Sequence, residues 1–324
     1  MRIYIDDSGT FSGFHTGSIA TVGALCVPHG RLEHLEKKYA LLRRKLPKEN
    51  QEVKGRLLSE RDVNNVVEFL ARNNVIFEIT AIDVGIHSET AAKNYRDQLA
   101  ANMTDRVQRF NEATRPKVET AIDQIKKCSI PLFMQAITTF DVIANVMQHI
   151  PLYFSQRQPK ELGKFEWGVD GKDRGKVTNW EQWWSSYACG ALATRSRNLP
   201  MPEPVGSDYS YFKKFEPADR GDGKSGIEMS LLLKDLRFSS DPEAGLELVD
   251  ILVNAIRPAM TGNLAIDGWR RIPALMIHRN EHYISLIRLE GASTLPLNPD
   301  YKAMMKHFWN GGKNMLAPRF LHED

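Results

Sequence analysis

The chain has 324 residues, of which 42% are hydrophobic and 26% are charged. This balance is typical of a soluble globular protein with a buried core, and it excludes general disorder. The 43 Lys and Arg residues nearly match the 40 Asp and Glu residues, which gives a formal net charge of +3. A histone-like polybasic binder is thereby excluded, but an enzyme that combines a basic groove with an acidic metal site is not.

The three cysteines, Cys26, Cys128 and Cys189, are far apart and form no CxxC pair. This spacing argues against a disulfide framework and favours a reducing compartment. The N-terminus reaches two acids before any apolar run, so we expect no signal peptide. The most apolar stretch, residues 130–153, is interrupted by polar side chains, which favours a core helix over a membrane span. We therefore expect a cytoplasmic protein.

Elements of the N-terminal half alternate between strand and helix patterns. Short β-branched runs predict strands over 2–5 and 18–27, the first ending at the turn sequence Asp-Asp-Ser-Gly. Helical spacing predicts helices over 32–46 and 60–72, and an alternating run predicts a strand over 75–84. Two helices that break at Pro116 are expected within 88–127, followed by a helix over 131–153.

The C-terminal half continues this mixture. We expect a strand over 164–169, a Trp-rich helix over 179–194, a loop over 198–226 and a strand over 227–238. A helix is expected over 242–256 with Asp241 as its N-cap, and a hairpin over 273–289. The order predicts a mixed α/β fold with one sheet flanked by helices. No linker divides residues 1–324, so we expect a single domain with a helical insertion at about 88–153.

Acidic residues stand where predicted strands end and inside one apolar helix. Asp6 closes the first strand, Asp170 closes a later one, and Asp250 lies in the apolar run GLELVDILVNAI. An acid in an apolar run is costly unless it is paired, protonated or bound to a metal. Hard divalent cations such as Mg²⁺ prefer a few carboxylate oxygens together with water. A shared metal site is one interpretation of this pattern.

The other interpretation needs no metal. Asp6, Asp7, Ser8 and Gly9 are all common turn residues. Asp250 could equally lie on an exposed helix face, with Glu247 one turn before it. These residues alone leave both interpretations open.

Four short segments carry a resemblance to a known family. They are RIYIDDSGTF, EVKG at 52–55, FEWGVD and GLELVDILVNAIRP. In this order they resemble the conserved elements of the bacterial family known as domain of unknown function 3800. Two positions depart from the family pattern: Asp7 stands where Glu is usual, and Glu247 stands where Gln is usual.

The resemblance implies an RNase H-like fold and a metal-dependent nuclease or a relative of one. It implies that Asp6, Glu52, Asp170 and Asp250 bind Mg²⁺ or Mn²⁺, and that Lys54 positions a phosphate or adjusts the charge of the site. Further ligands that we considered are Asp7 and Glu247. The expected substrate is nucleic acid, DNA or RNA, with no membrane involved.

Other motifs suggest different chemistry. The sequence HRNEH at 278–282 matches an inverted zinc-protease motif, but its apolar flanks predict a hairpin turn, whereas that chemistry needs a helix. ADRGDGKS at 218–225 loosely matches a phosphate-binding loop, without the strand and helix that should flank it. The aromatic segments YSYFKKF and NWEQWW could stack on bases or fill the core. A nucleic-acid-binding or assembly module without catalysis is the alternative to a nuclease.

Overall fold

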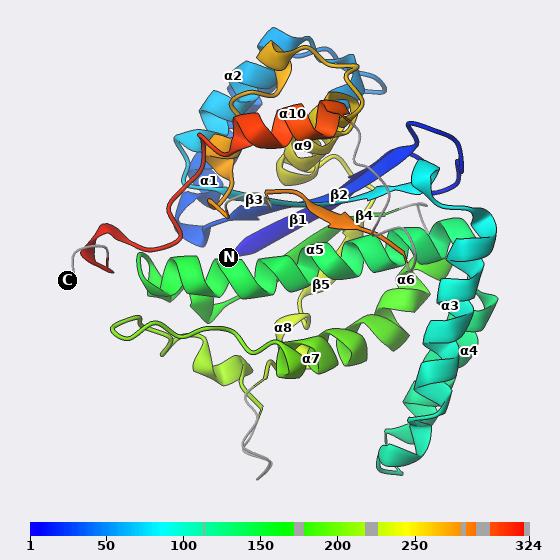
Figure 1. Cartoon of the computed structure of the whole chain (residues 1–324). Helices are drawn as coiled ribbons and strands as arrows, with labels where there is room; N and C mark the ends of the chain where they lie inside the picture. The colour runs from blue at the N-terminus through cyan, green and yellow to red at the C-terminus, as the bar shows by residue number, and fades with distance from the viewer. Residues whose placement is uncertain (113, 172–177, 218–225, 280–282, 290–298, 321–324) are drawn as a thin grey trace.

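A six-stranded sheet forms the centre of the protein in the computed structural model (Figure 1). The structure describes residues 1–112, 114–171, 178–217, 226–279, 283–289 and 299–320. The strands are β1 (Arg2–Ser8), β2 (Ile19–Val27), β3 (Ile76–Asp83), β4 (Glu166–Asp170), β5 (Leu236–Ser239) and β6 (Ser285–Ile287). Their order across the sheet is β5-β4-β1-β2-β3-β6.

The sheet is mixed in direction. β2 pairs antiparallel with β1 and β3, whereas β4 is parallel to β1, β5 to β4 and β6 to β3. Five strands therefore point the same way, and their carboxyl ends lie along one edge. This confirms the expected mixed α/β class.

Helices cover both faces of the sheet. On one face lie α1 (His29–Arg43), α2 (Glu60–Ala71), α9 (Ala244–Met260) and α10 (Pro299–Phe308) (Figure 1). On the other lie α5 (Ile130–Ser155), α6 (Asn179–Trp183), α7 (Cys189–Asn198) and α8 (Met229–Leu232). Each face has its own buried apolar cluster, and alternate strand residues enter each: Ile3 and Ile5 join the α5 side, and Tyr4 joins the α9 side. This period of two also fixes where polar strand residues point.

The long helix α5 is a core element. In the described residues it is the one helix long and apolar enough to cross a membrane, yet 72% of its most apolar window is buried inside the fold. It packs on β2 and β3. A buried core helix of a soluble protein shows this pattern.

The expected helical insertion consists of two parts. Helices α3 (Glu89–Thr104) and α4 (Arg115–Lys127) pack against each other as a hairpin that extends beyond the sheet (Figure 1). α5, by contrast, belongs to the central layer. The two helices expected over 88–127 are present, and the break between them lies just before Pro116, which stands in the first turn of α4, where its missing N–H costs no hydrogen bond.

Three expectations about local structure are wrong. The strand over 227–238 is replaced by helix α8 and the short strand β5, since Leu232 turns inward and Leu231 outward. The described residues of the expected hairpin, 273–279 and 283–289, do not pair with each other, because β6 pairs with β3 and Pro273 lies in a 3₁₀ turn over Ile272–Leu275. α9 begins at Ala244, after the extended residue Glu243, whose carboxylate binds Arg237 and Arg2.

A close contact between α9 and β1 makes one glycine necessary. A Cβ atom at Gly245 would lie 2.2–2.3 Å from three ring atoms of Tyr4. Gly245→Ala is therefore expected to destabilise the fold by about 2 kcal/mol, although Ala is the better helix former by about 1 kcal/mol. Gly190 in α7 has no neighbour within 4 Å of such an atom. Gly190→Ala should stabilise the protein by roughly 0.5 kcal/mol. Chemical denaturation of both variants measures the difference, and equal effects would contradict this packing.

Candidate functional site

Asp6 and Asp170 end two neighbouring parallel strands. Ile5 is paired with Val169, so the next residue of each strand, Asp6 and Asp170, is also aligned. Ile5 and Val169 both enter the cluster on the α5 side, and side chains alternate along a strand. Asp6 and Asp170 therefore point to the α9 side, each one residue beyond the last paired residues of the two strands. Both are half-buried.

Asp250 reaches the same face from α9. Its Oδ2 accepts a hydrogen bond from the Gly55 amide at 2.6 Å, and its Oδ1 accepts one from the Asn254 side chain at 2.7 Å. Ser8 Oγ in turn donates to Asn254 Oδ1 at 2.9 Å. Ser8 lies two residues beyond Asp6, on the same face of β1. These contacts tie Asp250 to the end of the strand that carries Asp6.

A tight turn between α1 and α2 presents Glu52 and Lys54. Glu49 and Glu52 exchange two backbone hydrogen bonds at 2.8 and 2.9 Å. The two residues between them, Asn50 and Gln51, have φ angles of 49° and 67°, as a primed hairpin turn requires. Gln51 occupies this strained conformation while its carbonyl accepts a hydrogen bond from Arg43 Nη2 at 2.6 Å.

Gly55 brings this segment against α9. A Cβ atom there would lie 2.7 Å from the Asp250 carbonyl oxygen and 2.8 Å from the Ile251 Cα atom. Only a glycine allows the backbone so close, and its amide can then bind the Asp250 carboxylate. The segment Glu52–Gly55 is thus held beside Asp250.

The ammonium of Lys54 lies among these acids. Lys54 Nζ is 2.9 Å from Glu52 Oε2. Burial alone would lower the pKa of Lys54, but this hydrogen bond and the negative charges of Glu52, Asp250 and Asp170 outweigh it, so the pKa is raised. The structure therefore brings Glu52, Lys54, Asp170 and Asp250 within electrostatic reach of one another.

Asp250 is costly to ionise in this position. Burial raises the pKa of Asp250, and the nearby Glu52 raises it further, although the Gly55 amide and Lys54 oppose the shift. A site of this kind gains stability from an additional positive charge, because a cation favours the carboxylate form.

Asp7 does not join this group. It follows Asp6 in β1, so its side chain points to the opposite face of the sheet. There Asp7 Oδ1 accepts a hydrogen bond from Gln135 Nε2 of α5 at 2.9 Å. Asp7 therefore lies on the other side of the sheet from Asp170 and Asp250.

Glu247 is engaged in a buried ion pair. Only 1% of its side chain is exposed. Its carboxylate accepts hydrogen bonds from Arg43 Nε and Nη2, both at 2.6 Å, from Tyr39 Oη at 3.0 Å and from the Val53 amide at 3.0 Å. These contacts join α1, α9 and the segment before Lys54, so Glu247 helps to hold Glu52 and Lys54 in place.

The donor set suits a hard divalent cation. Asp6, Glu52, Asp170 and Asp250 offer carboxylate oxygens, which Mg²⁺ and Mn²⁺ prefer. In the arrangement described, no three or more His, Cys, Asp or Glu side chains among the described residues are grouped closely enough to hold a metal ion. In this arrangement the positive charge beside Glu52 comes from the ammonium group of Lys54.

The other predicted motifs belong elsewhere. Trp180, Trp183 and Trp184 are buried and pack on one another, so NWEQWW fills the core. Tyr209, Phe212 and Phe215 of YSYFKKF are also buried. His278 contacts the Tyr283 hydroxyl, but residues 280–282 of HRNEH and all of 218–225 lie outside the described residues.

Two supporting residues were not among the predicted site residues. Asn254 fixes Asp250, and Ser8 links Asn254 to Arg257 by accepting a hydrogen bond from Arg257 Nε at 2.9 Å. The spacing of four residues between Asp250 and Asn254 places both on one helix face, and this was the available signal. No pattern in the sequence indicates the contact with Ser8, because it joins residues 246 positions apart.

Comparisons with protein-family models, with curated proteins and with solved structures found no match to this chain.

Proposed function

We propose that this protein is a nuclease that uses a divalent metal ion, Mg²⁺ or Mn²⁺, to hydrolyse phosphodiester bonds in DNA or RNA. One observation supports the proposal above all. Asp6 and Asp170 end adjacent parallel strands on the face that also receives Asp250 from α9. Three acids that are far apart in the chain thus lie on one face of the sheet, which supports the proposal of a shared cation.

Each residue has a distinct role in this proposal. Asp6, Asp170 and Asp250 hold the cation, and Glu52 adds a carboxylate from the facing turn. A bound divalent ion supplies a Lewis acid that lowers the pKa of water and stabilises charge on the phosphate oxygens. Lys54, raised in pKa and flanked by acids, stays protonated and attracts the phosphate of the substrate. Gly55 and Asn254 orient the Asp250 carboxylate.

The test is cleavage of labelled single- and double-stranded DNA and RNA with Mn²⁺ or Mg²⁺. We expect cleavage that EDTA abolishes and that Asp170→Asn lowers by about a hundredfold or more, because one ligand charge is lost. Calorimetric Mn²⁺ titration should show weaker binding by the variant. Equal cleavage by the wild type and Asp170→Asn would contradict the proposal. Salt-sensitive nucleic-acid binding with neither cleavage nor metal affinity would support a non-catalytic binding module instead.

The place of action follows from the same features. The cysteines are unpaired, and the most membrane-like helix is buried within the fold. We place the activity in the cytoplasm, where thiols stay reduced and nucleic acid is present.

A further inference from the structure

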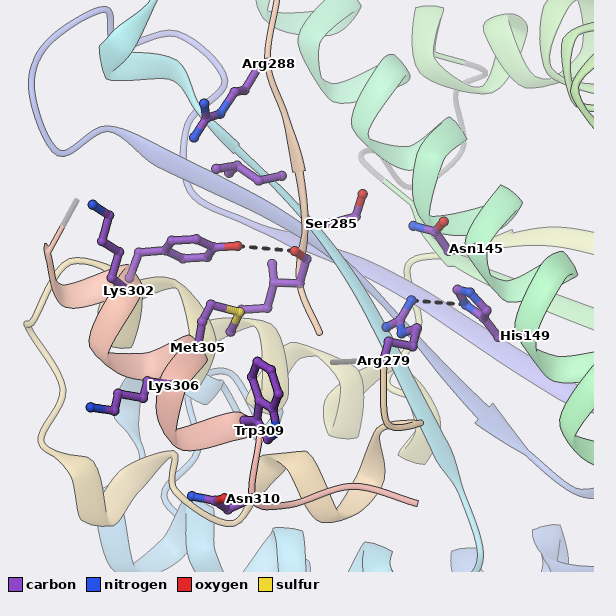
Figure 2. A pocket seen from close by; sticks show the side chains of 13 residues that line it. Asn145, His149, Arg279, Ser285, Arg288, Lys302, Met305, Lys306, Trp309 and Asn310 are labelled. Carbon is purple, nitrogen blue, oxygen red and sulfur yellow. Dashed lines mark hydrogen bonds between the residues drawn. The ribbon is translucent and has the colours of Figure 1, made fainter. Parts of the chain in front are cut away.

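A large cavity lies at the opposite edge of the sheet from the carboxylates. It has a volume of about 1070 Å³, opens to solvent and is lined by residues of α5, β6 and α10 (Figure 2). Its walls include Asn145 and His149 from α5, Ser285 from β6, and Lys302 and Trp309 from α10 and its end. Sites for small organic ligands occupy roughly 300–1000 Å³, so this cavity admits a ligand much larger than a single inorganic ion.

The side chains that line the cavity are basic. Arg279, Arg288, Lys302 and Lys306 contribute to the lining together with His149, and among the described residues no Asp or Glu does. Lys302 and Lys306 are exposed and one helical turn apart, and neither forms an ion pair with a described residue. Figure 2 shows both on the α10 side of the cavity. Their charge is thus available to an anionic ligand.

Two described acids that contact cavity-lining residues, Glu78 and Asp141, are already paired with basic groups. Glu78 is fully buried behind it and pairs with Arg279 at 2.9 Å and with His149 at 3.3 Å. Asp141 pairs with Arg195 at 2.8 Å and accepts a hydrogen bond from Ser285 Oγ at 2.7 Å. Arg288 carries a charge that also acts on Asp83. The described lining residues therefore carry a net positive charge, to which Lys302 and Lys306 contribute.

An aromatic surface lies beside these lysines. Trp309 is 47% exposed, whereas the other five tryptophans are at most 8% exposed. In Figure 2 its ring lies between Lys306 and Arg279. An exposed indole next to cations is the combination on which proteins stack bases and bind phosphates.

We propose that this cavity binds a nucleoside phosphate, either as a free nucleotide or as the end of a nucleic-acid strand. Lys302 and Lys306 contact the phosphates through charge-assisted hydrogen bonds. Trp309 stacks on the base, and the Arg279–His149 wall closes the inner end. The proposal is independent of the proposed nuclease activity, because Asp6 and Asp170 lie on β1 and β4, which β2 and β3 separate from the β6 edge that lines the cavity.

The experiment measures binding without metal. The wild-type protein in EDTA is titrated with ATP, a 5′-phosphorylated tetranucleotide and inorganic phosphate, by calorimetry and by tryptophan fluorescence. We expect ATP or the tetranucleotide to bind more tightly than phosphate and to quench Trp309. Tighter binding of ATP identifies a free nucleotide, and tighter binding of the tetranucleotide identifies a strand end. Asp6→Asn protein should bind ATP as the wild type does, which separates this site from the nuclease proposal.

Charge-reversal variants give the matched control. K302E/K306E should weaken ATP binding roughly tenfold or more. K93E/K117E reverses the charge of two exposed lysines on the α3–α4 hairpin. This control variant should change the affinity for ATP by less than twofold. Trp309→Ala should weaken binding of ATP more than that of phosphate. K302Q/K306Q replaces the first variant if its melting curve shows misfolding.

Three results would overturn the proposal. The first is that neither ATP nor the tetranucleotide binds. The second is that K302E/K306E and K93E/K117E lose ATP affinity equally. The third is that inorganic phosphate binds as tightly as ATP and Trp309→Ala has no effect. The last result identifies a simple anion site rather than a nucleotide site.

Discussion

Asp6→Asn is expected to lower metal-dependent cleavage by about a thousandfold, whereas Asp7→Asn should leave it within about threefold of the wild type. Asp6 points to the face that holds Asp170 and Asp250. Loss of its charge should weaken the proposed cation site and remove several kcal/mol of transition-state stabilisation. Initial rates at saturating Mn²⁺ measure the effect, and calorimetric Mn²⁺ titration shows whether affinity falls in parallel.

Asp7→Asn is a close control because it makes the same chemical change one residue away in the same strand. Asp7 lies on the opposite face, where it accepts a hydrogen bond from Gln135. Melting temperatures of both variants report any loss of folding. Equal loss of cleavage in the two variants, with both folded, would show that the α9 face is not the site of chemistry.

Arg279→Met is expected to lower the free energy of unfolding by about 3–5 kcal/mol at pH 7. Glu78 is fully buried, and Arg279 at 2.9 Å is its nearest charged partner. His149 Nδ1 is 3.3 Å away and carries a charge only when it is protonated, whereas Arg279 is always charged. Removal of Arg279 therefore leaves a buried carboxylate without a full counter-charge. Urea denaturation at pH 7 measures the loss.

The pH dependence gives this prediction a second signature. Burial raises the pKa of Glu78, but the charges of Arg279 and His149 outweigh burial, so the pKa in the folded protein is lowered. The ion pair therefore stabilises the fold at pH values above about 4.3, the pKa of a glutamate in the unfolded chain. This stabilisation is lost as the pH falls through the lower pKa of Glu78 in the folded protein. In Arg279→Met the effect of burial on Glu78 dominates, so the pKa of Glu78 in the folded protein is raised instead of lowered. The stability deficit of this variant should shrink between pH 7 and pH 5 as Glu78 takes up a proton.

The double variant Glu78→Gln/Arg279→Met is the control for a buried charge. It removes both charges and should recover most of the lost stability, because a neutral amide is far less costly to bury than a lone carboxylate. If the double variant is as unstable as Arg279→Met alone, the loss comes from packing and not from the unpaired charge.

Much of the local structure could be read from residue patterns. The strands at 2–5, 18–27 and 75–84 and the helices at 60–72 and 131–153 are found close to their predicted bounds. Their signals are short in range: apolar periodicity, a Ser59 cap and proline at an allowed first-turn position. The failures at 227–238 and 273–289 have one cause in common. In both segments the local pattern is ambiguous, and the secondary structure is determined by pairing with a strand that is distant in the sequence.

The sequence likewise predicts only part of the candidate site, and the tertiary structure decides the rest. Alternation along a strand already requires Asp6 and Asp7 to lie on opposite faces, and the expense of an acid in an apolar helix already marks Asp250. Folding alone selects the face: β4 aligns Asp170 with Asp6, and α9 packs on that side. Tertiary packing also brings Arg43, Tyr39 and Val53 to the Glu247 carboxylate, which accepts hydrogen bonds from all three. Local patterns carry spacing and polarity over a few residues, whereas these partners lie about 200 positions apart and meet only when the sheet and helices are packed.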